Sequence, residues 1–190
     1  MFGGQGDTIL SGLRNVIDGN LKQSSFPLSQ IIEAYKENSS KNLRFDDDFI
    51  AGLLKTEKDD PDCFLILALL LPDLDYSRAL EIDHLHPASA FKKKKLETHE
   101  FLKGDESKMT FYVDDCNWNT IANLHLLEKS KNRSKLDRPL KDWFEGMNGT
   151  TMWMLLIPEE ASLEFNAFEE FIKERTLKLA GELKNLGVSA

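Results

Sequence analysis

The sequence predicts an α+β fold that is mostly helical, with a small pair of strands embedded among helices. Much of the chain carries apolar residues at helical spacing, as in residues 9–17, 28–35, 49–54 and 165–183. Two short runs have the pattern of strands, residues 79–86 and 124–127, and a Lys/Arg-rich helical segment at residues 129–141 follows the second. We therefore expect a strand–strand–helix unit inside a helical protein.

Four helices are expected before the first strand. Asp7 is suited to cap the first helix, and the second begins after Pro27. Acidic residues at 46–48 favour the start of the third. The fourth, at residues 61–71, is apolar nearly all round, so we expect it to form the buried centre of a helical subdomain, residues 1–78.

The rest of the chain divides into a strand-containing core and a closing region. We expect the core at residues 79–146, and residues 147–190 should close over it through a long amphipathic helix. Within the core, residues 109–113 are compatible with either a strand or a short helix. The four lysines at residues 92–95 suit either contact with a phosphate backbone or a solvent-exposed face.

Length and charge limit the class of protein. With 190 residues the chain is long enough to bury a proper core, and one domain with an attached helical subdomain is the expected organisation. The chain has 24 basic and 32 acidic residues, which gives a formal net charge of −8. Such a charge argues against a protein that coats nucleic acid nonspecifically with its whole surface, so binding to a polyanion must use a local basic strip.

The cysteines and the N-terminal residues bear on where the protein works. Cys63 and Cys116 are far apart and form no C-x-x-C motif, which argues against a disulfide framework and a structural zinc cluster. The first residues lack the charged and apolar regions of a signal peptide, and the apolar run at residues 63–71 is too short to cross a membrane. We expect a soluble protein of the reducing cytoplasm, without a membrane partner.

The most informative residues are Asp83 and His84, at the end of the first predicted strand, together with Asn123 and Asn132. Phosphodiester hydrolysis needs a base that takes a proton from water and a cation that holds the scissile phosphate. Asp83 and the amide oxygen of Asn132 suit a hard cation such as Mg²⁺, which leaves His84 free as the base. Asn123 can hold the loop that carries His84, because an amide both donates and accepts hydrogen bonds.

Three motifs occur here in the order found in HNH endonucleases of the His-Me finger, or ββα-metal, class: D-H-L-H-P, N-L-H-L-L and N-R-S-K-L-D. The sequence therefore resembles that family. The resemblance implies a small ββα-metal hairpin in which Asp83 and Asn132 bind one divalent metal, Mg²⁺ or Mn²⁺. It also implies that His84 activates water and that Asn123 orients the loop of His84.

A wider likeness extends over most of the chain. The segments that carry it are F-G-G-Q-G-D-T-I-L, C-F-L-I-L-A-L-L-L-P, E-I-D-H-L-H-P-A-S-A-F and L-I-P-E-E-A-S-L-E-F. They are similar to the C-terminal nuclease half of GmrSD-type restriction proteins, in which a ParB/sulfiredoxin-like, nucleotide-hydrolysing domain precedes an H-x-x-P nuclease domain. The resemblance implies the DNA-cutting module of a modification-dependent restriction or phage-defence system, with a nucleotide-hydrolysing partner domain outside this chain.

A basic strip surrounds Asn132 and is opposed only by Asp137. It consists of Lys129, Lys131, Arg133, Lys135, Arg138 and Lys141. On an acidic protein such a cluster concentrates positive potential, which suits the positioning of one phosphate strand beside a metal. We expect DNA to be held by Lys131, Arg133, Lys135 and Arg138, with Arg133 and Lys135 contributing most.

Two other functions fit the same residues. In one, the nuclease motif is catalytically silent and the chain is a nucleic-acid-binding or assembly module. In the other, the enzyme acts on RNA, since chemistry at a phosphate does not by itself select the sugar. The intact set of Asp83, His84, Asn123 and Asn132 argues against the silent module.

Overall fold

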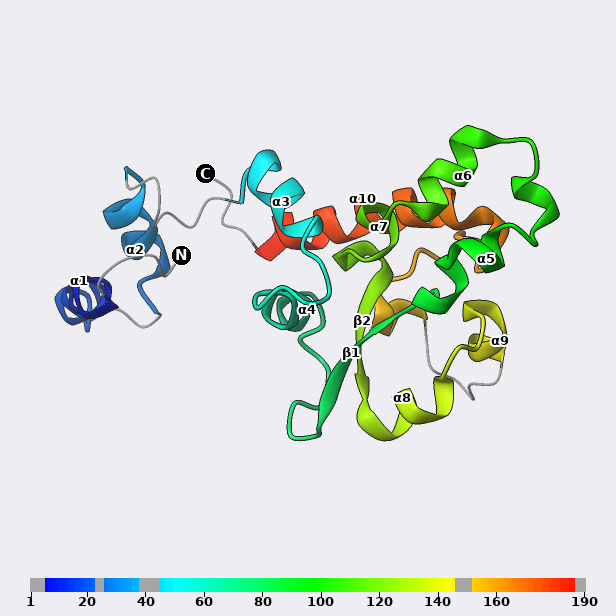
Figure 1. Ribbon diagram of the computed structural model, residues 1–190. Helices are drawn as coiled ribbons and strands as arrows, with labels where there is room; N and C mark the ends of the chain where they lie inside the picture. Colours follow the sequence, from blue (N-terminus) through cyan, green and yellow to red (C-terminus); the bar gives the residue numbers. More distant parts are fainter. Residues whose placement is uncertain (1–5, 23–25, 38–44, 146–151, 187–190) are drawn as a thin grey trace. The chain divides into compact units, whose positions relative to one another are not determined.

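The computed structural model describes residues 6–22, 26–37, 45–145 and 152–186 (Figure 1). Helices account for 62% of the structure, and the described residues contain one two-stranded antiparallel sheet, so the predicted mostly helical α+β class is confirmed. The chain separates into two compact units, residues 1–46 with 184–190, and residues 47–183. The expected helical subdomain 1–78 is therefore divided between the two units.

The helices and strands follow the order α1 Gly6–Gly19, α2 Leu28–Tyr35, α3 Asp47–Leu54, α4 Cys63–Leu70, β1 Leu80–His84, α5 Lys93–Leu96, α6 Glu106–Val113, α7 Asp115–Trp118, β2 Leu124–Glu128, α8 Lys129–Lys135, α9 Leu140–Glu145 and α10 Phe168–Leu186. Short 3₁₀ helices lie at Ala88–Phe91, Glu100–Leu102, Ile121–Asn123, Met152–Leu155 and Phe165–Ala167. Residues 109–113, compatible with two structures from the sequence, belong to helix α6.

In the smaller unit, helix α1 packs against α2. Both helices are amphipathic, as the spacing of their apolar residues predicts. The hydroxyl of Tyr35 donates a hydrogen bond of 3.3 Å to the carbonyl of Ile9, and Ile31 is the buried residue of α2.

In the larger unit, strands β1 and β2 lie side by side and run in opposite directions (Figure 1). Their register pairs Leu80 with Glu128 at one end and His84 with Leu124 at the other. Asp83 is paired with His125, and cross-strand partners in a sheet point to the same face. The register thus brings a carboxylate and an imidazole together.

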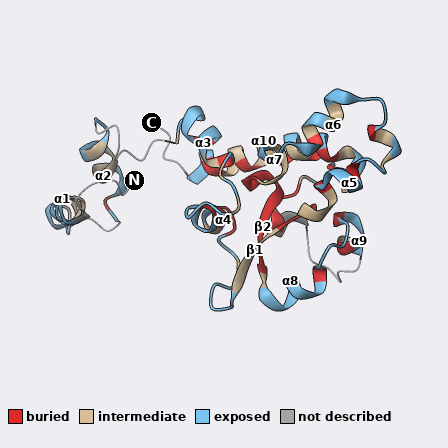
Figure 2. Cartoon of the chain, viewed as in Figure 1, coloured by how far each residue is buried: buried red, intermediate tan, exposed pale blue. Residues whose placement is uncertain are grey.

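The core of the larger unit is rich in aromatic rings and lies against the chain that leaves β1. Helix α10 contributes Phe168 and Phe171, which are fully buried. Figure 2 draws the buried residues of the chain in red. Phe91 stacks on Trp118, with 5.1 Å between ring centroids, and meets Phe168 edge-on at 4.6 Å. Ring contacts of this kind add to the free energy gained by burying apolar area, so this core is a rigid support for the end of β1.

Helix α4 differs from its sequence-based expectation. Cys63, Ile66, Leu67 and Leu70 are buried, but Phe64, Leu65 and Leu69 have exposed fractions of 41%, 54% and 44%. The prediction of a helix buried on all sides was therefore wrong. The physical reason is that α4 packs through one face onto β2 and the Ile121–Asn123 turn, while Phe64, Leu65 and Leu69 remain exposed.

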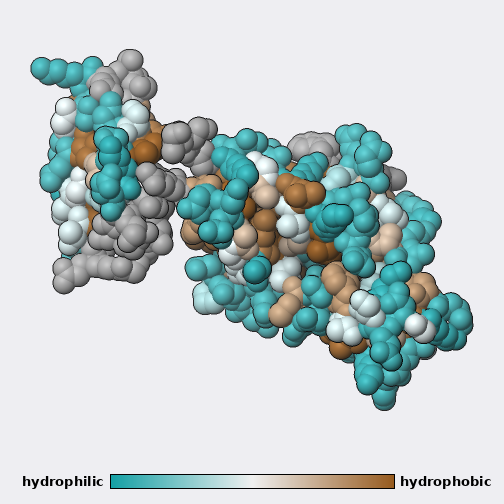
Figure 3. Space-filling model, turned by 90° about the horizontal axis from the view of Figure 1, so that it is seen from above, coloured by the Kyte–Doolittle hydropathy of each residue, from teal (hydrophilic) through white to brown (hydrophobic). Residues whose placement is uncertain are grey.

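The surface drawn in Figure 3 is mostly hydrophilic, with apolar patches between the charged side chains. Among the described residues, no helix is long and apolar enough to cross a membrane.

Candidate functional site

Strand β2 passes directly into helix α8, since Glu128 ends the strand and Lys129 begins the helix. Helix α8 packs on both strands, which completes the expected strand–strand–helix order (Figure 1). Asn132 and Lys135 lie three residues apart on α8 and so share one helix face. They contact Glu81 and Asp83, which lie two residues apart on β1 and share one strand face. A polar cluster therefore forms where α8 crosses β1.

Asp83 is the most strongly paired carboxylate of this cluster. Its Oδ2 atom accepts a hydrogen bond of 2.6 Å from Nζ of Lys135, which also donates to the carbonyl of His84. Nε2 of His125 lies 3.6 Å from the same Oδ2, beyond normal hydrogen-bonding distance. Burial raises the pKa of Asp83, but His125 and the positive charge of Lys135 lower it by more, so the carboxyl group is ionised at neutral pH.

His125 is completely buried beneath this carboxylate. Neither of its ring nitrogens has a hydrogen-bond partner within the described part of the chain. The ring packs against Trp143 of helix α9, with 5.4 Å between centroids. Burial lowers the pKa of His125 to about 4, so the imidazole is neutral at pH 7.

His84 ends strand β1 and is held from the segment after helix α7. Its Nε2 atom lies 3.0 Å from Oδ1 of Asn119, and its ring is 5.7 Å from that of Trp118. An amide oxygen only accepts, so Nε2 carries the proton and Nδ1 is the basic nitrogen. Burial lowers the pKa of His84, which favours the neutral ring that a general base requires.

Asn123 fixes the backbone that follows His84. Its Oδ1 accepts from the amide of His86 at 2.9 Å, and its Nδ2 donates to the carbonyl of His86 at 3.0 Å and that of Trp118 at 2.9 Å. The side chain is fully buried, so these bonds have no competition from water. The structure thus places Asn123 where it holds the chain between His84 and Pro87.

Arg175 of helix α10 holds the same region from the other side. Its guanidinium donates to the carbonyls of Ile121, Ala122, Leu124 and Leu155 at distances between 2.6 and 3.1 Å. Burial lowers the pKa of Arg175 to about 9, so the group remains charged at pH 7. Three of its four acceptors flank Asn123, and this arginine therefore sets the position of that residue.

Asn132 contacts Glu81. A direct contact between Asn132 and Asp83 is not among the contacts of the described residues. The Nδ2 atom of Asn132 donates a hydrogen bond of 3.0 Å to Oε2 of Glu81, which also pairs with Lys129 at 3.3 Å. Because Nδ2 is the donor, Oδ1 of Asn132 is directed away from Glu81. The cluster thus contains two carboxylates and one amide oxygen, the ligand types that a hard divalent cation prefers, and the ammonium groups of Lys129 and Lys135 pair with these carboxylates.

The basic strip is less uniform than the sequence suggests (Figure 2). Arg133 and Arg138 are exposed and form no ion pair within 4.0 Å with any described residue, whereas Lys131 pairs with Glu128 at 2.9 Å. Lys135 is only 1% exposed, because its ammonium group is turned inward to Asp83. The expectation that Lys135 reaches DNA phosphates from an exposed face therefore requires correction.

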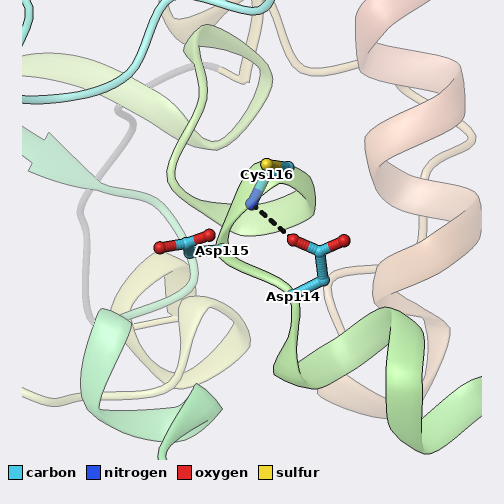
Figure 4. A group of neighbouring side chains, drawn as sticks. All are labelled: Asp114, Asp115 and Cys116. Atoms are coloured by element: carbon cyan, nitrogen blue, oxygen red, sulfur yellow. Dashed lines mark hydrogen bonds between the residues drawn. The ribbon is translucent and has the colours of Figure 1, made fainter.

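Asp114, Asp115 and Cys116 form a second group of possible ligands, with ligand atoms within 4.8 Å of one another (Figure 4). All three are exposed, and Oδ1 of Asp114 accepts from the amide of Cys116 at 3.1 Å, as a cap of helix α7. A hydrogen bond between the thiol of Cys116 and the carboxylate of Asp114 raises the pKa of that thiol, which disfavours the thiolate that binds metals. We therefore assign Asp114 a capping role and no metal site to the group.

Models of known protein families do not match this sequence, and neither do curated proteins. The functional argument therefore depends on the residues and their geometry. Sequence reasoning selected Asp83, His84, Asn123 and Asn132. In the structure Asp83 and His84 end β1, Asn123 directly precedes β2, and Asn132 lies on α8 in contact with Glu81 of β1.

Sequence reasoning missed Asn119, His125 and Arg175. Asn119 carried no motif, and the site role of His125 becomes visible only through the strand register. The sequence does contain a signal for Arg175, because this residue lies in the apolar stripe of α10 formed by Phe168, Phe171, Leu179 and Leu183.

Proposed function

We propose that this chain is a metal-dependent HNH DNA endonuclease. The observation that carries the proposal is the clamp of Asn123 on the His86 backbone, which holds His84 at the end of β1 with Nδ1 as its basic nitrogen. The three motifs of the sequence supply the same residues in the order of the His-Me finger class. The clamp residue Asn123 thus comes from a part of the chain distant from the base, and the carboxylate of Asp83 directly precedes the base in the sequence.

Each residue has a separate role in this proposal. Asp83 and Asn132 hold one divalent cation, Mg²⁺ or Mn²⁺, which supplies Lewis-acid stabilisation of charge on the scissile phosphate. His84 takes a proton from the attacking water at Nδ1, and Asn119 keeps the proton on Nε2. Asn123 orients the loop of His84. The exposed Arg133 and Arg138 contact neighbouring phosphates of the DNA.

The biological setting follows from the resemblance to GmrSD-type restriction proteins. We propose that the chain is the cutting module of a modification-dependent restriction or phage-defence system in the cytoplasm. Its partners would be DNA and a nucleotide-hydrolysing domain. RNA is the alternative substrate, since phosphate contacts by Arg133 and Arg138 do not distinguish the two sugars.

One observation favours a different function. The ammonium group of Lys135 already neutralises Asp83, as an internal cation would in a protein that uses no metal. In that case the chain is a catalytically silent binding or assembly module. The two functions differ in their response to metal, since only the nuclease requires one.

A plasmid-cleavage assay separates them. The nuclease should cut supercoiled DNA with Mg²⁺ or Mn²⁺ and lose this activity with EDTA, and His84→Ala should lower the cleavage rate by about 100-fold or more because the base is removed. Circular dichroism and DNA affinity of the variant should match the wild type. Equal cleavage by wild type and His84→Ala contradicts the assignment of the base, and a lack of cleavage in both contradicts the DNA endonuclease.

A further inference from the structure

We propose that His125 is a nitrogen ligand of a divalent cation bound beside Asp83, so that the site selects a transition metal such as Co²⁺ or Mn²⁺ over Mg²⁺. The inference rests on the proposed metal-dependent function and deepens it. It adds a ligand on strand β2 that none of the three motifs includes.

The strand register brings the two groups close to coordination distance. Asp83 and His125 are cross-strand partners, and Nε2 of His125 is 3.6 Å from Oδ2 of Asp83. Two ligand atoms at about 2.1 Å from one metal lie about 3.0 to 3.4 Å apart in octahedral or tetrahedral geometry. A small movement of either side chain therefore allows both to bind the same cation.

The imidazole of His125 also lacks any other partner. Both ring nitrogens are buried and without a hydrogen bond within the described part of the chain, which is unusual for a buried polar group. His86 gives a useful contrast, since its Nε2 is also unpartnered but its ring is surrounded by Phe165, Phe168 and Phe171. Of these two histidines, His125 has a carboxylate beside it.

Lys135 marks the position of a cation at this carboxylate. Its Nζ is 2.6 Å from Oδ2 of Asp83 and 5.1 Å from the centre of the Trp143 ring, which also packs on His125. Two cations cannot share this oxygen at such distances, because their charges repel. A divalent ion that binds Asp83 and His125 therefore displaces the ammonium group of Lys135, whose flexible stem permits the movement.

The chemistry of the donor set determines the metal. Mg²⁺ prefers oxygen ligands and retains water, whereas a neutral imidazole suits the transition metals. A site with the carboxylate of Asp83 and the imidazole of His125 consequently favours Mn²⁺ or Co²⁺. Asn132 and water complete its coordination shell with further oxygen atoms.

Mn²⁺ binding to the full chain tests this directly. Calorimetry should show one saturable Mn²⁺ site, and pulsed electron paramagnetic resonance should detect the hyperfine coupling of a ¹⁴N nucleus bound to the ion. The coupling should vanish in His125→Leu and in His125→Gln, which places an amide where Nε2 lies. The Mn²⁺ affinity of His125→Leu should fall by about tenfold or more, and its Mg²⁺ affinity should change far less.

Two control variants identify the nitrogen. His86→Leu removes the other buried, unpartnered imidazole, and His84→Ala removes the proposed base, and both should retain the coupling. Bound Mn²⁺ without nitrogen coupling in the wild type overturns the proposal, even if the histidine variants do not fold. Coupling that persists in His125→Leu or disappears in His84→Ala also overturns it, as does the lack of a saturable Mn²⁺ site.

The metal-ligand proposal and the endonuclease proposal can fail separately in this experiment. Nitrogen coupling from His125 in a protein that does not cleave DNA supports the metal site and contradicts the endonuclease. Mg²⁺-dependent cleavage with Mn²⁺ bound through oxygen alone supports the endonuclease and contradicts the role of His125.

Discussion

At the residue scale, the chemistry of the candidate site depends on which nitrogen of His84 carries a proton. Asn119 decides this, because its amide oxygen lies 3.0 Å from Nε2 and accepts the hydrogen of that nitrogen. The opposite nitrogen, Nδ1, is then available as the base. A residue outside all three motifs thus determines the tautomer on which the proposed reaction relies.

Replacing Asn119 tests that role. Asn119→Ala should lower kcat by about 10- to 100-fold with little change in KM, since it removes a positioning contact and no substrate contact. Asn119→Asp keeps an acceptor and should restore most of the rate, and its charge should raise the pKa of His84 and shift the acid limb of the pH profile upward. Nitrogen NMR of the ring reports the tautomer itself. An unchanged His84 tautomer in Asn119→Ala would contradict the assigned role.

His86 makes the stability of the fold depend on pH. It is 1% exposed, it packs edge-on against Phe168 and Phe171, and burial lowers its pKa to about 3 with a smaller contribution from Lys135. The unfolded chain protonates this histidine below about pH 6.5 and the folded chain does not. Stability is therefore lost as the pH falls from 6.5 towards 3.

Denaturant titration at two pH values measures the effect. Between pH 7 and pH 5 the free energy of unfolding should fall by about 2 kcal/mol more in the wild type than in His86→Leu, which has no group to protonate. The comparison cancels the contributions of the remaining titratable groups. The same loss in both proteins would show that His86 becomes charged within the fold.

At the element scale, the site depends on contacts between segments that are distant in sequence. Helix α10 reaches the Ile121–Asn123 turn through Arg175, and helix α8 reaches β1 through Asn132 and Lys135. A buried charge is stabilised only when its hydrogen bonds are made, and Arg175 satisfies four carbonyls at once. The long closing helix is consequently a support of the site as well as a cover of the core.

Variants of Arg175 should show how much its charge and its hydrogen bonds to four carbonyls contribute to the stability of the fold. Arg175→Met keeps much of the volume but leaves four buried carbonyls without donors, so it should destabilise the fold by about 3 to 5 kcal/mol. Arg175→Lys keeps the charge and fewer donors and should lose less. Thermal unfolding gives the stability, and amide exchange at residues 121–124 reports the loop. A Met variant as stable as the wild type would show that these carbonyls do not need Arg175.

The sequence could predict those features that neighbouring residues determine, and it could not predict those that depend on contacts with distant residues. Apolar spacing identified α1, α2, α3 and α10, and the motifs placed Asp83 and Asn123 at the strand ends. Burial depends on which elements pack together, and a local pattern does not contain this information. One face of α4 is therefore exposed although its sequence is apolar. The inward turn of Lys135 was also unpredictable, because its partner Asp83 lies 52 residues away on another element.

At the scale of the whole molecule, an acidic protein must bind a polyanion through a small part of its surface. The formal net charge of −8 repels DNA, and ionic screening limits this repulsion to about 10 Å at moderate salt. Within the described chain, Arg133 and Arg138 are the exposed members of the basic strip that have no ion pair within 4.0 Å. They are therefore the best-placed residues for the proposed contacts with DNA phosphates.

Reversing these two charges tests the strip against a matched control. Arg133→Glu with Arg138→Glu should weaken binding to duplex DNA and lower the slope of affinity against salt by about 0.9 for each lost phosphate contact. Lys93→Glu with Lys94→Glu, on the exposed face of α5, changes the net charge equally and should have a much smaller effect. Fluorescence anisotropy at several salt concentrations gives both quantities. Equal losses in the two variants would mean that net charge alone governs binding, and a larger loss in the α5 variant would move the DNA path to the lysines at residues 92–95.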